Sequence, residues 1–148
     1  MSRLWLFLHL LGFVMWMGGG LASMFAGIAA KSETRASLGA VVRAQAAIQR
    51  SIIAPGALLT VLSGLMLTFA LAGMAGASVW LMVMQGTGLV AALITLFVAL
   101  PTATRLSRLD PTGEQAAYFD ELRNRQKVAG MIWGVLALVS LVGGTLVR

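Results

Sequence analysis

The sequence contains no cysteine, one histidine, three prolines and only five acidic residues among 148. Without cysteine, the chain forms no disulfide and offers no thiolate to a metal. Charged residues make up 11% of the chain, whereas soluble domains carry about 25%. Hydrophobic residues make up 59%. This composition excludes an ordinary soluble domain and indicates an integral membrane protein.

Four long apolar runs dominate the chain, at residues 4–30, 52–73, 78–102 and 128–147. Each is long enough for a helix that crosses a hydrocarbon layer about 30 Å thick. We therefore expect an all-α fold, an antiparallel bundle of four transmembrane helices that forms a single domain over residues 1–148. Membrane lipids are its expected partners, and a homo-oligomer or a larger membrane complex is compatible with the sequence.

The basic residues are distributed unevenly between the two ends of the predicted bundle. Nine of the eleven fall in or beside the first and third connections: Lys31, Arg35, Arg43, Arg50, Arg105, Arg108, Arg123, Arg125 and Lys127. The positive-inside rule then places both long connections in the cytoplasm and both termini outside. We expect a multi-pass protein of the bacterial cytoplasmic (inner) membrane. The net charge of +6 reflects this topology, and no nucleic-acid partner is expected.

The two long connections have sequences typical of helical extensions. Apolar residues recur at near-helical spacing in the first one. In the second, Asp110 or Thr112 is positioned to cap a helix that continues into the fourth span. Asp120 is spaced for a helix-surface ion pair with Arg123. These charges are expected to lie at solvated helix ends near lipid phosphates.

His9 lies in the apolar segment LHLLGFVMWMGGG of the first span. At 100° per residue it shares one arc of the helix with aromatic and small residues: Trp5, Gly12, Phe13, Trp16, Gly19, Gly20, Ser23 and Gly27. Small residues on such a face let another helix, or a flat ligand, approach the backbone closely. The imidazole is therefore expected to face the interior of the bundle.

An ionisable side chain at membrane depth is a functional candidate by default. His9 could ligate a haem iron, bind copper together with thioether sulfurs or relay a proton. The structural alternative is a histidine bonded to Gln85, Thr68 or a buried water. A rise of about 1.5 Å per residue places Gln85, Met66 and Met82 at a depth similar to that of His9. Gln85 lies on a small-residue face that would let it meet His9. The predicted cofactor site comprises His9 as the metal ligand with Gly12, Trp16, Gly19, Met66, Met82 and Gln85.

The segment LHLLGFVMWMGG, an H-x6-W-x-G-G pattern, resembles the opening helix of HemJ-type protoporphyrinogen oxidases and of related small membrane proteins, including the CopD-like copper-resistance group. RSIIAPGALLTVLSGLMLT, an R-x4-P pattern, resembles the start of their second span. The resemblance implies that His9 is the ligand of haem b. HemJ-type proteins usually carry a lysine early in the third span, where this chain has Gln85 and no lysine. What the resemblance implies is therefore haem binding and not the oxidase reaction.

Three functional hypotheses follow. The leading one is a membrane protein that binds haem b through His9 and acts in membrane redox or haem handling. The alternative is a non-catalytic structural or assembly subunit of a larger membrane complex, because reactive groups are scarce and glycine-rich faces are common. Copper handling through His9, Met66 and Met82 is the third. The sequence assigns no reaction to the chain, and its status as an enzyme stays open.

Overall fold

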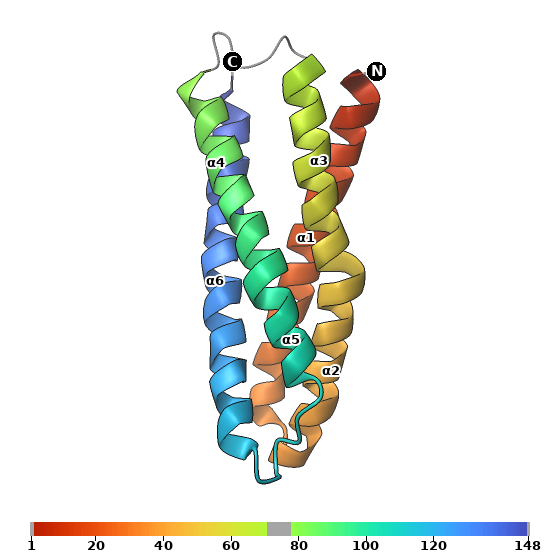
Figure 1. Cartoon of the computed structure of the whole chain (residues 1–148), viewed down its shortest axis with the longest axis vertical. Helices are drawn as coiled ribbons and strands as arrows, with labels where there is room; N and C mark the ends of the chain where they lie inside the picture. Colours follow the sequence, from red (N-terminus) through yellow and green to blue (C-terminus); the bar gives the residue numbers. More distant parts are fainter. Residues whose placement is uncertain (1, 71–77, 148) are drawn as a thin grey trace.

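The computed structural model describes residues 2–70 and 78–147 of the chain. In this part, four helical runs are long and apolar enough to cross a membrane: Arg3–Ser32, Arg35–Ala70, Val79–Leu106 and Ala116–Leu146. They run alternately up and down, so both termini lie at one end (Figure 1). We call this the terminal end, and the opposite one, with the two long connections, the loop end. The predicted all-α, four-helix membrane bundle is confirmed.

The helical runs are longer than the apolar segments because the connections are largely helical. α1 (Ser2–Ala29) continues into a short turn, η1 (Ala30–Ser32). The second run begins with η2 (Arg35–Ser37) and α2 (Leu38–Ile48), ahead of its apolar part, and α6 (Ala116–Leu146) begins well before residue 128. The expected end of the second span at 71–73 and most of the short second connection lie outside the described residues.

The second and third runs each contain a π-helical turn. α2 is joined to α3 (Ala54–Ala70) by η3 (Gln49–Ile53), and α4 (Val79–Ile94) is joined to α5 (Leu100–Leu106) by η4 (Thr95–Ala99). Each turn ends shortly before a proline, Pro55 or Pro101. Proline lacks an N–H and its ring clashes with the carbonyl four residues earlier. The wider π turn changes the hydrogen-bond pattern there, so each run continues through its proline.

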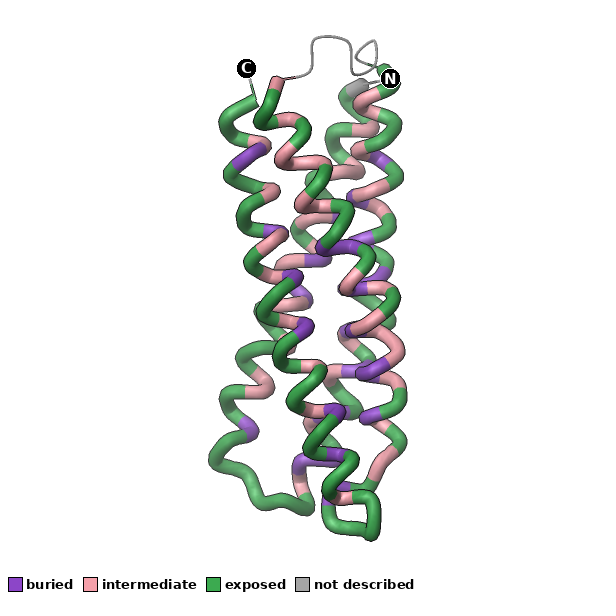
Figure 2. Tube along the Cα trace, turned by 60° about the vertical axis from the view of Figure 1, so that its left-hand side comes forward, coloured by how far each residue is buried: buried purple, intermediate pink, exposed green. Residues whose placement is uncertain are grey.

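The helices pack as two close pairs, α1 with α3 and α4 with α6. In the first pair, Gly12 and Gly56 face each other, and a Cβ added to Gly56 would lie 2.8 Å from the Gly12 carbonyl oxygen. In the second pair, the Ser140 hydroxyl donates to the Met84 carbonyl at 2.8 Å. Small residues allow such close approach between membrane helices. Exposed residues occur along the full length of every helix (Figure 2). They include large apolar side chains such as Phe69 and Phe97.

The core lies where the two pairs meet in the middle of the bundle. It consists mainly of alanines around two tryptophans: Trp16, Ile53, Ala57, Ala91, Ala92, Ala99, Ala129, Trp133 and Ala137. Trp16 and Trp133 stack with ring centroids 5.7 Å apart and planes 16° apart. A second cluster at the loop end contains larger residues, Leu38, Val42, Leu106, Phe119 and Leu122, together with Ala30. Here the connections have a core of their own.

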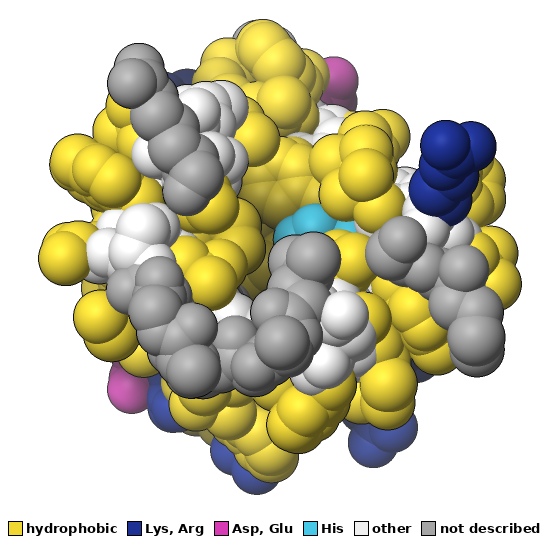
Figure 3. Space-filling model, turned by 90° about the horizontal axis from the view of Figure 1, so that it is seen from above, with side chains coloured by type: hydrophobic (Ala, Val, Ile, Leu, Met, Phe, Trp, Pro, Cys, Tyr) yellow, Lys and Arg dark blue, Asp and Glu magenta, His cyan; other side chains and the backbone are white. Residues whose placement is uncertain are grey.

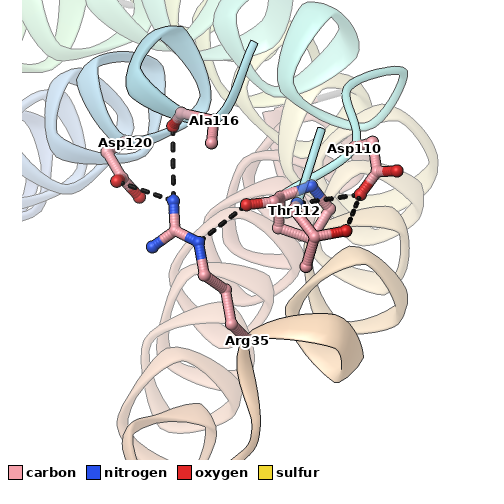
Figure 4. Close-up of polar contacts among 6 residues, drawn as sticks. Arg35, Asp110, Thr112, Ala116 and Asp120 are labelled. Atoms are coloured by element: carbon pink, nitrogen blue, oxygen red, sulfur yellow. Dashed lines mark hydrogen bonds and ion pairs between the residues drawn. The ribbon is translucent and has the colours of Figure 1, made fainter. Parts of the chain in front are cut away.

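Arg35 ties the two long connections together at the loop end (Figure 4). Its Nε donates to the Pro111 carbonyl at 2.7 Å, and its Nη2 lies 2.8 Å from a carboxylate oxygen of Asp120. Asp120 therefore pairs with another segment and not with Arg123, the partner that helical spacing predicted. Sequence spacing identifies partners within one helix only, whereas this ion pair joins residues 85 positions apart.

Asp110 and Thr112 do not cap α6. That helix begins at Ala116, and its N-cap residue, Gln115, makes no side-chain hydrogen bond to the helix end. Asp110 instead accepts hydrogen bonds from the backbone N–H of Thr112 at 2.9 Å and from its hydroxyl at 2.8 Å. These bonds, the backbone one foremost, hold the pKa of Asp110 below its ordinary value. The pair forms a local turn (Figure 4).

Candidate functional site around His9

His9 is half-buried on α1 and faces α3 and the interior of the bundle. Its Nδ1 lies 2.8 Å from the backbone carbonyl oxygen of Thr60, and the Ser63 hydroxyl oxygen lies 3.4 Å from the same nitrogen. A carbonyl oxygen only accepts hydrogen bonds, so Nδ1 carries the hydrogen in this contact. In the neutral form of an imidazole with this hydrogen bond, Nε2 is the unprotonated nitrogen and has a free lone pair.

Among the described residues, no hydrogen bond uses Nε2 of His9. The buried side-chain polar atoms without a partner in this part of the chain occur only at Gln49 and Gln126, so Nε2 is not fully buried. Figure 3 looks onto the terminal end and shows a hollow among apolar side chains, with the histidine on its wall. The imidazole of His9 therefore borders this hollow, and Nε2 is its nitrogen without a hydrogen-bond partner.

Glycines on both helices determine how the imidazole is held. A Cβ added to Gly64 would lie 3.1 Å from Cε1 of His9 and 3.3 Å from Nδ1, so the ring packs against the bare backbone of α3. One turn after His9, a Cβ on Gly12 would lie 2.8 Å from the backbone nitrogen of Thr60. His9 and Gly12 thus contact the same residue of α3, and the close approach at Gly12 brings the carbonyl within reach of the imidazole.

Trp16 lies below His9 on the side of the loop end, about 10 Å along α1 at 1.5 Å per residue. Its side chain is 1% exposed, stacks on Trp133 and donates from Nε1 to the Thr95 hydroxyl at 3.2 Å. The ring was expected either to pack or to stack on a macrocycle. In this structure it packs against Trp133 in the core of the bundle.

Gln85 does not hydrogen-bond to His9. Its amide nitrogen donates to the Thr68 hydroxyl at 2.5 Å, one helical turn beyond Gly64 toward the terminal end. The expected contact between Gln85 and His9 is therefore replaced by a bond that joins α4 to α3. Residue counting predicts a similar depth for both residues, but the rotation of α4 directs the amide to the Thr68 hydroxyl.

The methionines and Gly19 lie apart from the histidine. Met66 is 44% exposed and Met82 is 52% exposed. At 100° per residue, Met66 lies about 120° around α3 from Thr60, the residue that faces α1, so it belongs to the outer face. Gly19 packs against Ile53, whose Cγ1 would lie 2.7 Å from an added Cβ. It serves the contact between α1 and η3.

The sequence did not predict four residues that contact His9 or Trp16: Thr60, Ser63, Thr95 and Trp133. Small residues recur at one face of α3, at positions 56, 60, 63 and 64, and this pattern was the available signal for the first two. The decisive group is a backbone carbonyl, which every residue carries. The described residues contain no group of three or more histidine, aspartate or glutamate side chains that could hold a metal ion.

The comparisons with known proteins agree with the transmembrane architecture. The family model described as "Predicted integral membrane protein (DUF2269)" matches residues 3–146. No curated protein and no solved structure matches the chain. The family match supports a small membrane protein whose outer side chains contact lipid, and it does not extend to the HemJ-type or CopD-like proteins. With the match covering almost its whole length, the chain belongs to the DUF2269 family of predicted integral membrane proteins.

Proposed function

We propose that this protein binds haem b through Nε2 of His9 and acts in membrane redox or haem handling. The observation that best supports this proposal is the 2.8 Å contact between Nδ1 of His9 and the Thr60 carbonyl oxygen. Histidines that bind metals generally donate their other ring N–H to a carbonyl or carboxylate, which fixes the tautomer and the ring orientation. His9 has this arrangement, and its ring borders a hollow at the terminal end (Figure 3).

The donor set favours a macrocycle over a bare metal ion. His9 supplies one nitrogen, whereas a closed zinc or copper site needs several protein donors. In haem the porphyrin supplies four nitrogens, so one axial histidine is enough. When bound, haem supplies one-electron chemistry at its iron. Met66 and Met82, the thioethers expected to assist copper, are about half exposed on the outside of the bundle, which disfavours copper handling.

The chain's own residues would hold and shield the group. The Thr60 carbonyl fixes the imidazole, and Gly64 leaves room for the ring beside α3. The stacked pair of Trp16 and Trp133 lies buried in the core, toward the loop end from His9. The H-x6-W-x-G-G pattern, which resembles the first span of HemJ-type proteins, supports the same assignment for His9.

The proposed orientation places the hollow on the outer side of a bacterial cytoplasmic membrane. Its support is the concentration of nine basic residues in or beside the two long connections, because such residues favour the cytoplasmic side. A ligand at His9 would then enter from the outer leaflet or the periplasm. Protease accessibility of tags on either terminus in spheroplasts tests this orientation.

An absorption spectrum tests the haem proposal. Protein purified from haem-replete cells, or reconstituted with haemin, is expected to show a Soret band with about one haem per chain. His9→Gly should abolish the band, and added imidazole should restore it by occupying the vacated position. Ser140→Ala, which removes a hydroxyl from the other helix pair, is the matched control and should keep the spectrum. A colourless wild-type protein after reconstitution, or an unchanged band in His9→Gly, would refute haem ligation by His9.

One observation favours the second candidate, a structural or assembly subunit. An added Cβ on Gly130 or Gly134 of α6 would meet no atom within 4 Å. Glycines four residues apart are a common contact face between membrane helices. If this role is correct, Gly130→Leu with Gly134→Leu should dissociate a copurifying partner or second copy, while His9→Gly leaves the assembly intact. A wild-type protein that is monomeric and functions fully without a partner would contradict this structural role.

A further inference from the structure

A second site lies at the loop end, far from His9. It is an open cavity of about 400 Å³ between the start of α2 and the segment that follows α5. Its walls are mainly polar and include Gly39, Arg43, Ser107, Arg108, Asp110 and Pro111. Two segments far apart in the sequence thus form one pocket, and Arg35 fixes their relative position through its bonds to Pro111 and Asp120.

Two guanidinium groups line this cavity, from Arg43 and Arg108. Both side chains are exposed, and within residues 2–70 and 78–147 neither makes an ion pair or a side-chain hydrogen bond. The nearest carboxylate, that of Asp110, accepts two hydrogen bonds from Thr112. The cavity therefore keeps two cationic groups whose hydrogen-bond donors are available to a ligand.

Gly39 forms part of the cavity floor and is itself buried. A Cβ added there would lie 3.2 Å from Nη1 of Arg43 and 3.6 Å from Cδ of Pro111. The guanidinium group of Arg43 therefore lies over the bare backbone of α2. Because position 39 has no side chain, the guanidinium group of Arg43 can lie there, at the edge of the cavity.

The position of the cavity along the bundle indicates where its ligand comes from. Arg108 lies six residues beyond residue 102, where the predicted apolar span ends. At the helical rise of 1.5 Å per residue, this is about 9 Å from the end of the span. Lipid headgroups occupy roughly 5–8 Å on each side of the hydrocarbon core. The side chain of Arg108 is thus within reach of phosphates at the membrane surface, and Arg43 lines the same cavity. Guanidinium groups bind phosphate oxygens through paired, charge-assisted hydrogen bonds.

We propose that the cavity between Gly39, Arg43 and Arg108 binds a phosphate group, carried by an anionic lipid headgroup or by a free phosphate compound. This site is independent of haem binding at His9. The two sources share the same chemistry at the guanidinium groups. They differ in whether the ligand arrives from the bilayer or from the aqueous phase.

The full chain in lipid nanodiscs distinguishes the two sources. The first arm measures saturable binding of phosphatidylglycerol, by native mass spectrometry, in nanodiscs titrated from pure phosphatidylcholine. The second arm titrates inorganic phosphate against protein in phosphatidylcholine nanodiscs. We expect saturable binding in at least one arm, weakened about tenfold by Arg43→Gln with Arg108→Gln, since each lost charge-assisted pair is a strong hydrogen-bonding contact.

Two further variants make the result decisive. Lys31→Gln with Arg125→Gln removes the same charge from the loop end outside the cavity, and its binding should change less than threefold. Gly39→Leu keeps both arginines but fills the floor, and it should weaken binding as much as the arginine pair does. Equal loss in the control pair, full binding in a folded Gly39→Leu protein, or no saturable binding in either arm would each overturn the proposal.

Discussion

Gly12→Ala is expected to weaken the bundle through a single methyl group. The added Cβ would lie 2.8 Å from both the backbone nitrogen and the hydroxyl oxygen of Thr60, and 2.9 Å from the carbonyl oxygen of Gly56. Ordinary contacts of a Cβ begin near 3.4 Å. Two of the three atoms belong to the backbone of α3, so a rotamer change cannot relieve the clash. The helices must separate locally by about 0.5 Å, as judged against the tight packing of protein interiors.

The expected loss in the free energy of unfolding has two parts. Overpacking of a close contact costs about 1–3 kcal/mol. The same separation lengthens the 2.8 Å contact between Nδ1 of His9 and the Thr60 carbonyl, and a weakened hydrogen bond in a membrane protein loses up to about 1 kcal/mol. We expect the free energy of unfolding to fall by about 2–3 kcal/mol. Gly56→Ala, whose Cβ would lie 2.7 Å from the backbone nitrogen of Trp16, should show a similar loss.

Unfolding of the detergent-solubilised protein by SDS, followed through the fluorescence of its four tryptophans, measures this change. Gly18→Ala is the matched control on the same helix, because its Cβ would meet no atom within 4 Å. It should be as stable as the wild type or slightly more stable, since alanine is the better helix former. Equal stability of Gly12→Ala and Gly18→Ala would refute the inference that the α1–α3 contact depends on Gly12.

Three further outcomes test other parts of the structure. Trp133→Ala should lower the free energy of unfolding by about 3 kcal/mol, because it removes a buried stacking partner and leaves a cavity; a loss below about 1 kcal/mol would contradict the central packing. Asp120→Asn, which removes the exposed ion pair with Arg35, should cost less than about 1 kcal/mol and only at low salt, so a large effect that persists in high salt would be inconsistent with an exposed pair. The bonds from Thr112 lower the pKa of Asp110, so they stabilise the fold above the carboxyl's ordinary pKa, and this contribution is lost as the pH falls through the lowered value. Carboxyl-carbon NMR should show the Asp110 pKa rising in Thr112→Val, which removes the hydroxyl bond and keeps the backbone one, and an unchanged pKa would show that the hydroxyl does not bond to Asp110.

The inward direction of His9 follows from the sequence, because helical periodicity fixes the side of α1 on which a residue lies. The same periodicity places Gly12 and Trp16 on the histidine's face. It does not identify the atom opposite the imidazole. That atom is the Thr60 carbonyl, and backbone carbonyls have no signature in a sequence. Gln85 shows the same limit, since its depth was estimated along one helix but its partner depends on the rotation of α4 relative to α3.

The loop end shows a further limit of sequence reasoning. Helical spacing predicted a partner for Asp120 within α6, and the structure pairs it with Arg35 from the first connection. Composition predicted a basic end, but the cavity exists only because two connections meet there, with the Arg43 guanidinium group lying over Gly39. Such contacts depend on which segments meet in space, and a single sequence contains no record of that choice.

By itself, the sequence determined four membrane spans, their alternating direction and the faces on which small and polar residues lie. These properties depend on hydrophobic length and on a repeat of 3.6 residues per turn, both of which are local. Only the tertiary structure decided which helices pair and how closely. That decision rests on contacts between glycine backbones such as Gly12 and Gly56, because membrane helices associate through close packing and not through a hydrophobic drive. The free nitrogen of His9 is a product of that packing.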